Sequence, residues 1–324
     1  MKNVLIIFGG NSSEHDISCI SAKSILKNID TNLFNVTAVG ISKNNDWYIY
    51  NDKIDILDKD WLNKSIFKIT NIIEFLKEFD VVFPITHGNN GEDGKLEGLL
   101  DLFNIKYVGS KTLASSIGFD KEASKIFFDY LGIRQVPFIT IYERNIKEIE
   151  NKINYPIIIK PACGGSSIGI SKAENKKELK KALKEAFKYD TKIIIEKFIN
   201  ARELEVAVLK KNDDLIISDI GEIVSCNNFY DYNAKYEKES KLEIPANINL
   251  DLKNKIKETA NKIFNNLNLD SYARIDFFLE DNNLYINEIN TIPGFTEISM
   301  YPKLIMNEGI TYKDLITILI MNAK

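Results

Sequence analysis

The sequence predicts an α/β protein that becomes α+β toward its carboxyl end, and three observations lead to this prediction. Over the first hundred or so residues, short apolar runs alternate with segments of helical apolar spacing. From about residue 204 onward, β-branched and aromatic runs separated by turn residues indicate antiparallel strands. With 324 residues, 44% of them hydrophobic, the chain is long enough for two to three domains. We expect three units, residues 1–112, 113–203 and 204–324.

The first unit is predicted to be a doubly wound parallel sheet. The expected elements are strands at residues 4–8, 36–41 and 81–85 and a helix over residues 17–26. Strands that alternate with helices form parallel sheets, and such sheets bind ligands at their carboxyl edge. Two glycine-containing loops lie at that edge, residues 9–14 and 87–94. The chain has only two histidines, His15 and His87, and both lie in or beside these loops, which favours a functional role for each.

The second and third units are predicted to mix helices with strands. The second begins near Thr112, with helices over residues 114–131 and 176–189 and strands at residues 138–142, 157–160 and 192–196. The third has helices over residues 250–266 and 312–321 and a hairpin between them. Because no repeat or low-complexity linker separates the units, we expect them to pack tightly.

Bulk composition excludes several classes of protein. The formal net charge of −4 implies no affinity for nucleic acid. No segment approaches the ~20 apolar residues of a membrane span, and the apolar run at the amino terminus is too short for a signal sequence. Cys19, Cys163 and Cys226 are scattered and odd in number, which suits a reducing compartment. We therefore expect a cytoplasmic protein that binds neither nucleic acid nor membranes.

A hairpin near residue 282 carries the most informative side chains. Its strands are expected at residues 272–280 and 284–289. Centring the hairpin on Asn282 places Asp276 opposite Glu288. The same register places Arg274 opposite Asn290, with all four side chains on one face. Facing carboxylates repel each other unless a cation lies between them, and two carboxylates with an amide oxygen are hard ligands that suit Mg²⁺. The planar fork of Arg274 suits an oxyanion or a phosphate.

A glycine-rich turn follows the strand at residues 157–160. Lys160 ends that strand, and Gly164 and Gly165 follow it. Glycines let the backbone approach a polyanion, and successive N–H groups can cradle phosphate. This is not a Walker A loop, because the lysine precedes the glycines. Taken alone, the pattern fits a phosphate cradle or an ordinary β-turn equally well, with Lys160 and, more weakly, Lys121 as cations for phosphate.

Two further segments suggest a nucleotide. Glu196 ends an apolar strand that leads into the third unit, where an adenine could bind the backbone and Glu203 could reach a ribose. Residues 227–241 are polar, aromatic and aperiodic, which is typical of a long functional loop or lid.

Together these motifs resemble the ATP-grasp ligases and, more closely, the D-alanine–D-alanine ligase family. The resemblance implies a three-unit ATP-grasp architecture in which the last two units clamp ATP. It extends from residue 4 to about residue 304 in one order, and the matching segments are residues 9–14, 87–94, 229–236, 287–291 and 293–299.

The resemblance also implies roles at the matched positions. The catalytic residues would be Glu14, Ser166, Tyr236, Arg274 and the Gly294 amide. The two substrate subsites would use Glu14 and His87 for the first amino acid and Ser299 and Met300 for the second. ATP would contact Lys121, Lys160, Ser166, Ser167, Glu196, Lys197, Phe198, Ile199, Glu203, Lys235 and Asn287. Two Mg²⁺ or Mn²⁺ ions would bind Asp276, Glu288 and Asn290.

The implied reaction joins two D-alanine molecules through an acyl phosphate, for peptidoglycan precursor synthesis, in a homodimeric enzyme. One alternative within the family is a ligase that adds D-serine or D-lactate. Tyr236 argues against lactate, because lactate-adding relatives have a histidine at this position, and Met300 argues against D-serine, because D-serine-adding relatives tend to have arginine there. The alternative from another class is a nucleotide-binding pseudoenzyme, against which the intact Asp276, Glu288, Asn290 and Arg274 argue.

Overall fold

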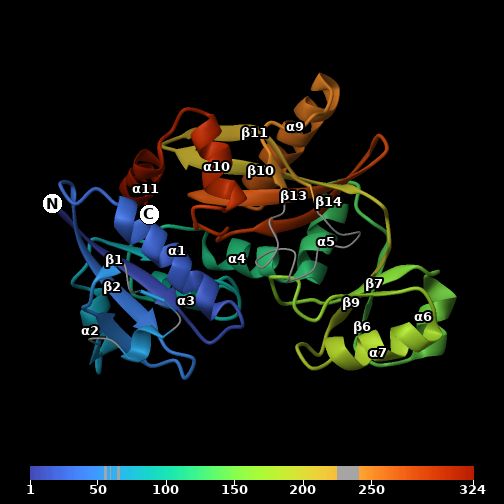
Figure 1. The fold of residues 1–324 in the computed structure, drawn as a ribbon, viewed down its shortest axis with the longest axis horizontal. Coiled ribbons are helices and arrows are strands. Elements are labelled where there is room, and N and C mark those ends of the chain that lie inside the picture. Colours follow the sequence, from blue (N-terminus) through green and yellow to red (C-terminus); the bar gives the residue numbers. More distant parts are fainter. Residues whose placement is uncertain (55–56, 59, 64–65, 225–240) are drawn as a thin grey trace.

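The structure is a computed structural model, and it describes all residues except 55–56, 59, 64–65 and 225–240. Three sheets follow one another along the chain, and Figure 1 shows the first at one end of an elongated molecule and the second at the other. The third sheet, formed by the last part of the chain, lies between and above them in that view. This arrangement places the edges of all three units around one central region.

The first sheet confirms the predicted parallel strands and adds two others. Its order is β4-β3-β2-β1-β5, in which β1 pairs with both β2 and β5 in parallel. The elements are β1 Lys2–Gly9, α1 His15–Asn28, β2 Phe34–Ile41, β3 Trp47–Tyr50, β4 Ile66–Lys68, α2 Ile72–Leu76, β5 Val81–Pro84 and α3 Lys95–Leu102. Strands β3 and β4 are antiparallel additions that the sequence analysis missed. Because β3 has only four residues, its alternation was too brief to stand out.

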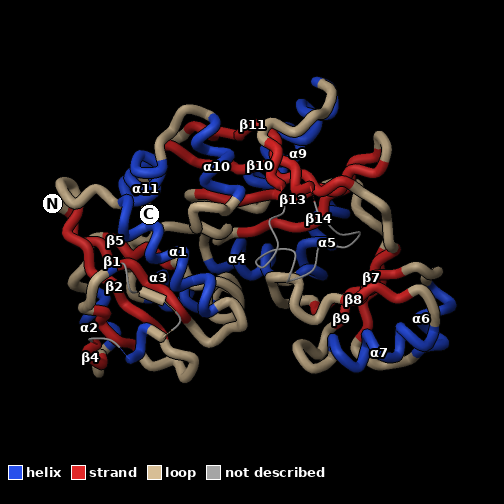
Figure 2. The backbone as a smooth tube through the Cα atoms, in the orientation of Figure 1, coloured by secondary structure: helices blue, strands red, loops and turns tan. Residues whose placement is uncertain are grey.

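The second sheet is antiparallel throughout, in the order β6-β9-β7-β8, and Figure 2 shows β7, β8 and β9 beside two helices at one end of the molecule. Its elements are β6 Phe138–Ile141, α6 Ile146–Lys152, β7 Ile157–Pro161, β8 Ser171–Ala173, α7 Lys176–Ala186 and β9 Ile193–Lys197. Its core contains side chains from α6, α7 and the sheet, among them Ile149, Ile159 and Leu179. The second unit therefore has a hydrophobic core of its own.

The third sheet has the order β12-β11-β10-β13-β14 and is also antiparallel. Its elements are β10 Arg202–Lys211, β11 Asp214–Val224, β12 Lys241–Glu243, α9 Leu250–Asn266, β13 Tyr272–Glu280, β14 Asn283–Asn290, α10 Met300–Asn307 and α11 Tyr312–Met321. Side chains of α9 pack into one core of this sheet, while α10 and α11 contribute to another. The predicted helices at residues 250–266 and 312–321 are confirmed.

The expected helix over residues 114–131 is two helices, α4 Thr112–Phe119 and α5 Lys121–Tyr130. Asp120 separates them in an extended conformation, and its carboxylate accepts hydrogen bonds from the backbone N–H groups of Glu122 and Ala123. An aspartate that caps a helix in this way starts a new helix. Both helices pack against the third sheet, and Figure 1 shows them beneath β13 and β14. The unit boundaries at 112/113 and 203/204 stay a prediction.

The first and third units share one hydrophobic core. Val4 and Phe8 of β1 belong to the same buried cluster as Phe295 and Leu319 near the end of the chain. The ring of Phe83 lies 6.0 Å from that of Phe295, in an edge-to-face contact. The first and third units are therefore joined by a continuous apolar interior.

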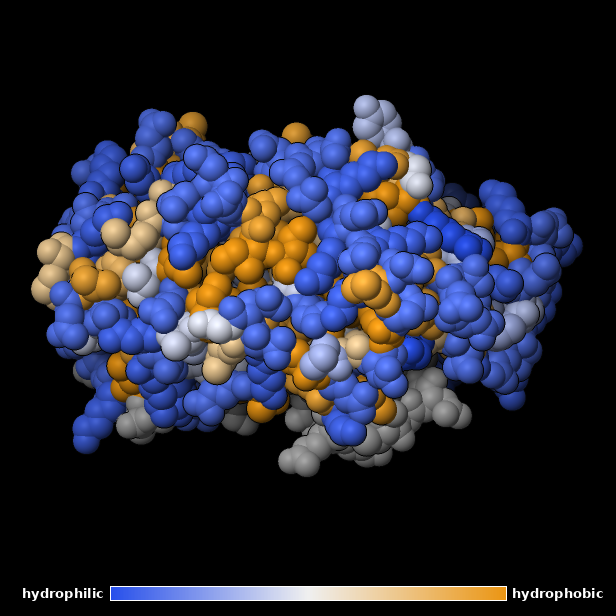
Figure 3. Space-filling view, turned by 90° about the horizontal axis from the view of Figure 1, so that it is seen from above, coloured by the Kyte–Doolittle hydropathy of each residue, from blue (hydrophilic) through white to orange (hydrophobic). Residues whose placement is uncertain are grey.

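One face of the molecule shows how polar and apolar side chains are distributed on its surface. Figure 3 shows a largely hydrophilic face crossed by a hydrophobic band. Within the described ranges, no helix has both the length and the apolar character needed to span a membrane.

Candidate active site

The predicted hairpin register is confirmed. Asp276 on β13 pairs with Glu288 on β14, and Arg274 pairs with Asn290. The turn is one residue shorter than expected, because Glu280 pairs with Asn283. A β-bulge between the Asp276 and Phe277 pairs makes up the difference. Asn287 is the extra residue of that bulge, so it has no partner in the pairing of β13 with β14.

Arg274 lies among three carboxylates on adjacent strands. Its Nε atom donates to Oδ1 of Asp276 over 2.7 Å, and its Nη2 atom donates to Oδ2 of the same carboxylate, also over 2.7 Å. Its Nε atom is also 3.0 Å from Oε2 of Glu205, which pairs with Asp276 from β10. Burial alone would lower the pKa of Arg274, but Asp276, Glu205 and Glu288 raise it well above its usual value. The guanidinium is therefore a permanent cation at this place.

Glu205 is a site residue that the sequence analysis missed. It lies two residues after Glu203 on the same strand, so both side chains project from one face. That spacing was visible in the sequence and could have indicated it.

The residues predicted to bind metal offer a suitable set of donors. Asp276 and Glu288 face each other with Asn290 beside them, and the Asn290 amide donates to Asp276 Oδ2 over 2.9 Å. Within the described ranges no cluster of three or more His, Cys, Asp or Glu side chains has a metal-binding arrangement. Two carboxylates and an amide oxygen are nevertheless the hard ligands that Mg²⁺ accepts while it keeps waters and binds phosphate oxygens. The chemistry of the donors thus fits a divalent cation.

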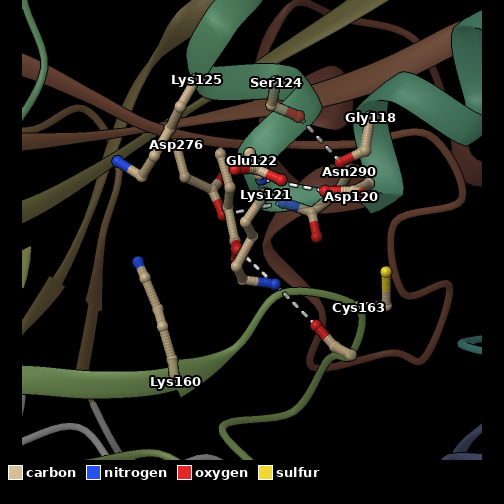
Figure 4. A network of polar contacts seen from close by, with 12 residues as sticks. Gly118, Asp120, Lys121, Glu122, Ser124, Lys125, Lys160, Cys163, Asp276 and Asn290 are labelled. Atoms are coloured by element: carbon tan, nitrogen blue, oxygen red, sulfur yellow. Dashed lines mark hydrogen bonds and ion pairs between the residues drawn. The ribbon is translucent and has the colours of Figure 1, made fainter. Parts of the chain in front are cut away.

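Lysines and a glycine-rich loop face this carboxylate cluster. Lys121 Nζ donates to the carbonyl oxygen of Gly164 over 2.7 Å and lies 3.6 Å from Glu288 Oε2. Figure 4 shows Lys121 reaching from the start of its helix toward the loop, with Asp276 and Asn290 beside it. The loop residues Ser166 and Ser167 both have positive φ values, 52° and 58°. This turned backbone brings the loop of the second unit close to the hairpin of the third.

The same loop also reaches the first unit at Glu14. Ser166 Oγ donates to Glu14 Oε1 over 2.5 Å. A Cβ atom on Gly165 would lie 2.5 Å from Glu14 Oε2, so only glycine allows the loop to come this close. Glu14 and Ser166, which are 152 positions apart in the sequence, thus form one side of the site.

The two histidines have different surroundings. His87 donates from Nδ1 to the carbonyl oxygen of Ile292 and accepts at Nε2 from Ser21. Burial lowers the pKa of His87, so its imidazole is neutral. His15 donates to the Gly10 carbonyl and accepts from the indole of Trp61, which fixes the first loop. Only His87 lies on the cavity wall, and the expectation of a functional role for His15 gains no support from its contacts.

A cavity of about 1120 Å³ joins these parts. The predicted site residues that line it are Glu14, His87, Lys121, Ser166, Arg274, Glu288, Asn290, Gly294, Ser299 and Met300. The predicted residues outside its lining are Lys160, Ser167, Glu196, Lys197, Phe198, Ile199, Glu203, Asp276 and Asn287. Lys235, Tyr236 and most of the predicted lid lie outside the described residues. The structure therefore brings all the described catalytic and substrate candidates to one cavity, whereas among the described ATP candidates only Lys121 and Ser166 line it.

Ser299 and Met300 occupy the end of the cavity formed by the third unit. Ser299 Oγ accepts from the Thr296 amide over 3.1 Å and lies 2.7 Å from the Thr296 hydroxyl. Met300 is buried, and its Sδ atom would lie 2.6 Å from a Cβ atom on Gly221. The Met300 thioether thus packs closely against the backbone of β11 at Gly221.

The comparisons with known proteins agree with one another. Family models described as "D-ala D-ala ligase N-terminus" and "D-ala D-ala ligase C-terminus" match residues 3–110 and 127–321. A D-alanine–D-alanine ligase from Acetivibrio thermocellus is 45% identical, over 98% of this chain and 95% of the relative. One from Clostridium novyi is 44% identical, over 98% and 96%.

Solved structures of two ligases have a fold similar to that of this chain. The VanG D-Ala:D-Ser ligase from Enterococcus faecalis has a TM-score of 0.88 and 36% identity, over 99% of this chain and 98% of the other. The D-alanine–D-alanine ligase from Coxiella burnetii has a TM-score of 0.81 and 29% identity, over 100% and 95%.

Proposed function

The chain belongs to the D-alanine–D-alanine ligase family, and from this premise we propose how its residues divide the work of the reaction. The enzyme is an ATP-dependent ligase that joins two D-alanine molecules into D-alanyl-D-alanine for peptidoglycan synthesis. One observation carries the residue assignment. Glu14 of the first unit, Ser166 of the second and Arg274 of the third line a single cavity.

The first D-alanine binds at the loops of the first unit. Its ammonium group pairs with Glu14, whose carboxylate is held by Ser166. His87, neutral and hydrogen-bonded on both ring nitrogens, forms the wall beside it. Because His87 already donates to Ile292, it shapes the subsite instead of exchanging protons.

ATP lies between the second and third sheets. Lys121 and Lys160 supply cations for its phosphates, with Ser166, Ser167 and Asn287 nearby. The adenosine part lies along the end of β9 and the following turn, with Glu196, Glu203 and the backbone of residues 197–199. Lys235 and Tyr236, from the segment outside the described residues, complete the phosphate site and the cover.

Asp276, Glu288 and Asn290 would hold the divalent cations. Mg²⁺ bound there supplies positive charge that offsets the charge of the phosphate oxygens. The hydrogen bond from Asn290 to Asp276 keeps these donors together.

Acyl transfer requires a site for an oxyanion, and Arg274 with the Gly294 amide forms it. Asp276 and Glu205 engage the Nε and Nη2 atoms of Arg274, which leaves the Nη1 side for the tetrahedral intermediate. A fixed cation that needs no reorientation stabilises developing negative charge most effectively. The carboxylate pair behind the guanidinium therefore orients it.

The acceptor is D-alanine, bound at Ser299 and Met300. The compact wall that Met300 forms against Gly221 supports a methyl side chain here. D-Serine is the second candidate, since VanG, a D-Ala:D-Ser ligase, has a similar structure, and a pocket shaped for a methyl group rejects an added hydroxyl by only about 10². Lactate is disfavoured by Tyr236. We further propose a cytoplasmic homodimer.

Phosphate release in the presence of ATP and each amino acid tests the proposal. We expect release that depends on D-alanine and falls by at least about 10² in Glu288→Gln, because that carboxylate serves phosphoryl transfer. If the native chain released no phosphate, the chain would be a nucleotide-binding pseudoenzyme. If Glu288→Gln released phosphate as fast as the native chain, Glu288 would not be a metal ligand.

Competition between D-alanine, D-serine and D-lactate at equal concentration identifies the acceptor. We expect D-alanine to exceed D-serine at least tenfold in kcat/KM, within the limit set by a methyl-sized pocket. Mass spectrometry of the products measures this directly. A predominance of D-Ala–D-Ser would establish the alternative acceptor.

A further inference from the structure

Lys125 is a buried cation that belongs to none of the sequence motifs and does not line the cavity. It lies on α5 with only 2% of its surface exposed. Its Nζ atom is 2.5 Å from Glu196 Oε1, 3.4 Å from Gln135 Oε1 and 4.8 Å from the centre of the Phe138 ring. A charge so fully removed from water is costly unless it is paired, so Glu196 is the partner that makes this burial possible.

Glu196 is shared between two lysines. Its Oε2 atom is 2.7 Å from Lys160 Nζ, while its Oε1 atom contacts Lys125. Burial alone would raise the pKa of Glu196, but Lys160 and Lys125 hold it at about 2. The carboxylate is therefore ionised, and the three groups together carry one net positive charge.

The two lysines come from different parts of the fold. Lys160 and Glu196 lie on β7 and β9 of the second sheet, whereas α5, which carries Lys125, contributes Phe128 to the core of the third sheet. Figure 4 shows Lys125 extending from its helix and Lys160 extending from the strand below it, with both ammonium groups on the same side of the view. Lys125 thus reaches from a helix that packs against the third sheet to a carboxylate on a strand of the second sheet.

The net charge of Lys125, Glu196 and Lys160 determines how strongly this cluster can attract the phosphates of a nucleotide. If Lys125 were absent, Glu196 and Lys160 would form a simple ion pair with no net charge. With Lys125 present, Glu196 is neutralised by one lysine and the charge of the other remains for an anionic ligand.

We propose that Lys125 is a positioning residue for nucleotide binding, which engages Glu196 so that the positive charge of Lys160 is available to the phosphates. The inference rests on the proposed function in one respect, the assignment of Lys160 to the nucleotide. It adds Lys125, which does not line the cavity, to the residues that determine ATP affinity.

Binding of ADP and of adenosine to Lys125→Met, Lys125→Arg and the native enzyme tests the inference. We expect Lys125→Met to weaken ADP binding at least about tenfold and to change adenosine binding much less, because the effect passes through a charge that meets phosphate. Lys125→Arg should retain most of the affinity for ADP. Lys180→Met, which removes an exposed lysine from α7, is the matched control and should bind both ligands normally.

A double variant separates positioning from support of the fold. In Lys125→Met/Glu196→Gln the buried carboxylate is also neutral, so Lys160 regains its uncompensated charge. Because the loss of the Glu196 carboxylate from the adenosine site affects adenosine and ADP alike, we expect this variant to have a higher ratio of ADP to adenosine affinity than Lys125→Met alone. We also expect it to fold even if the single variant does not, since both partners of the buried pair are removed together.

Equal losses for adenosine and ADP in Lys125→Met, or no recovery of the ratio of ADP to adenosine affinity in the double variant, would overturn the inference. Should the single variant fail to fold, the double variant decides alone, and a ratio of ADP to adenosine affinity well below that of the native enzyme would count against the inference. Lys160→Met tests the assignment of Lys160 to the nucleotide separately from the role of Lys125. Normal ADP binding in that variant would refute the nucleotide assignment itself, whereas impaired binding there with normal binding in Lys125→Met would refute only the role of Lys125.

Discussion

At the scale of single residues, Glu97 on α3 makes stability depend on pH. Burial, followed by the nearby charges of Asp93 and Asp101, raises its pKa to about 8 despite a hydrogen bond from Ser115. The unfolded chain releases this proton near pH 4.5, whereas the folded protein retains it up to about pH 8. In this pH window the folded protein binds more protons than the unfolded chain. Glu97 therefore lowers the free energy of unfolding progressively as pH rises from about 4.5 to about 8.

Replacement of Glu97 by glutamine should remove this loss. We expect Glu97→Gln to have a higher Tm than the native protein at pH 8.5 and a difference that shrinks as the pH falls toward 5, since each unit of pKa shift corresponds to about 1.4 kcal/mol. Thermal unfolding across this pH range measures it, with the exposed Glu258→Gln on α9 as control. A Tm difference that is the same at every pH would show that Glu97 does not titrate in this window.

Arg274 supports a second prediction at this scale. Arg274→Lys keeps the charge but loses the planar fork that contacts Asp276 and Glu205. We expect kcat to fall by about 10²–10³, as when an oxyanion donor is lost, while the KM for ATP changes much less. Steady-state kinetics with varied ATP and D-alanine separate the two parameters. A loss seen mainly in the KM for ATP would make Arg274 a phosphate ligand.

At the scale of elements, the bulge in β14 determines which side chains reach the site. On β13 the core residues alternate without interruption, at Ile275, Phe277 and Leu279. On β14 they are Leu284, Ile286 and then Ile289, so the alternation changes phase across Asn287. This change of phase is visible in the sequence and indicates a bulge. A simple two-residue turn without the bulge would have placed Glu288 one position away from Asp276.

The bulge and the Asn287 side chain can be tested separately. Asn287→Ala keeps the bulge and removes the side chain, whereas deletion of Asn287 removes the bulge but leaves Asp276 and Glu288 able to pair. We expect the deletion to lower kcat at least about tenfold at a nearly unchanged Tm, because the lost local twist aims Glu288 differently, and we expect Asn287→Ala to lose less. Similar activity of the deletion variant and the native enzyme would mean that the bulge has no catalytic role.

Local patterns in the sequence predicted these elements well, and their failures have physical causes. Strands β1, β2 and β5 are continuous apolar runs, and the Asp276–Glu288 pair follows from residue counting. The division between α4 and α5 at Asp120 was missed because apolar spacing continues through the break, although an aspartate followed by helix formers is itself a start signal. Lys125 was missed because its role depends on partners from distant strands, which local spacing does not contain.

At the scale of the whole molecule, the first and third units should unfold together and the second separately. Leu319 of α11 lies in the core that the first and third units share, whereas Leu179 of α7 lies in the core of the second sheet. Leu319→Ala and Leu179→Ala should each cost about 2–5 kcal/mol of local stability. Native-state hydrogen exchange should show the loss at β1 and β10 for the first variant, and only within residues 138–197 for the second. Loss spread evenly over all three sheets in either variant would indicate a single cooperative unit.

The shared core also has a consequence for how the protein is made. The face of the first sheet that α11 and residues near Phe295 cover is complete in sequence after β5, but its cover is translated roughly 200 residues later. At ~5–20 residues per second, this interval is on the order of 10–40 s. During that time, the part of this face that α1 leaves uncovered presents apolar side chains that the last helices bury in the folded protein. The ribosome-bound chain is therefore a client for chaperones that shield apolar surface, and its exposure ends when α11 emerges.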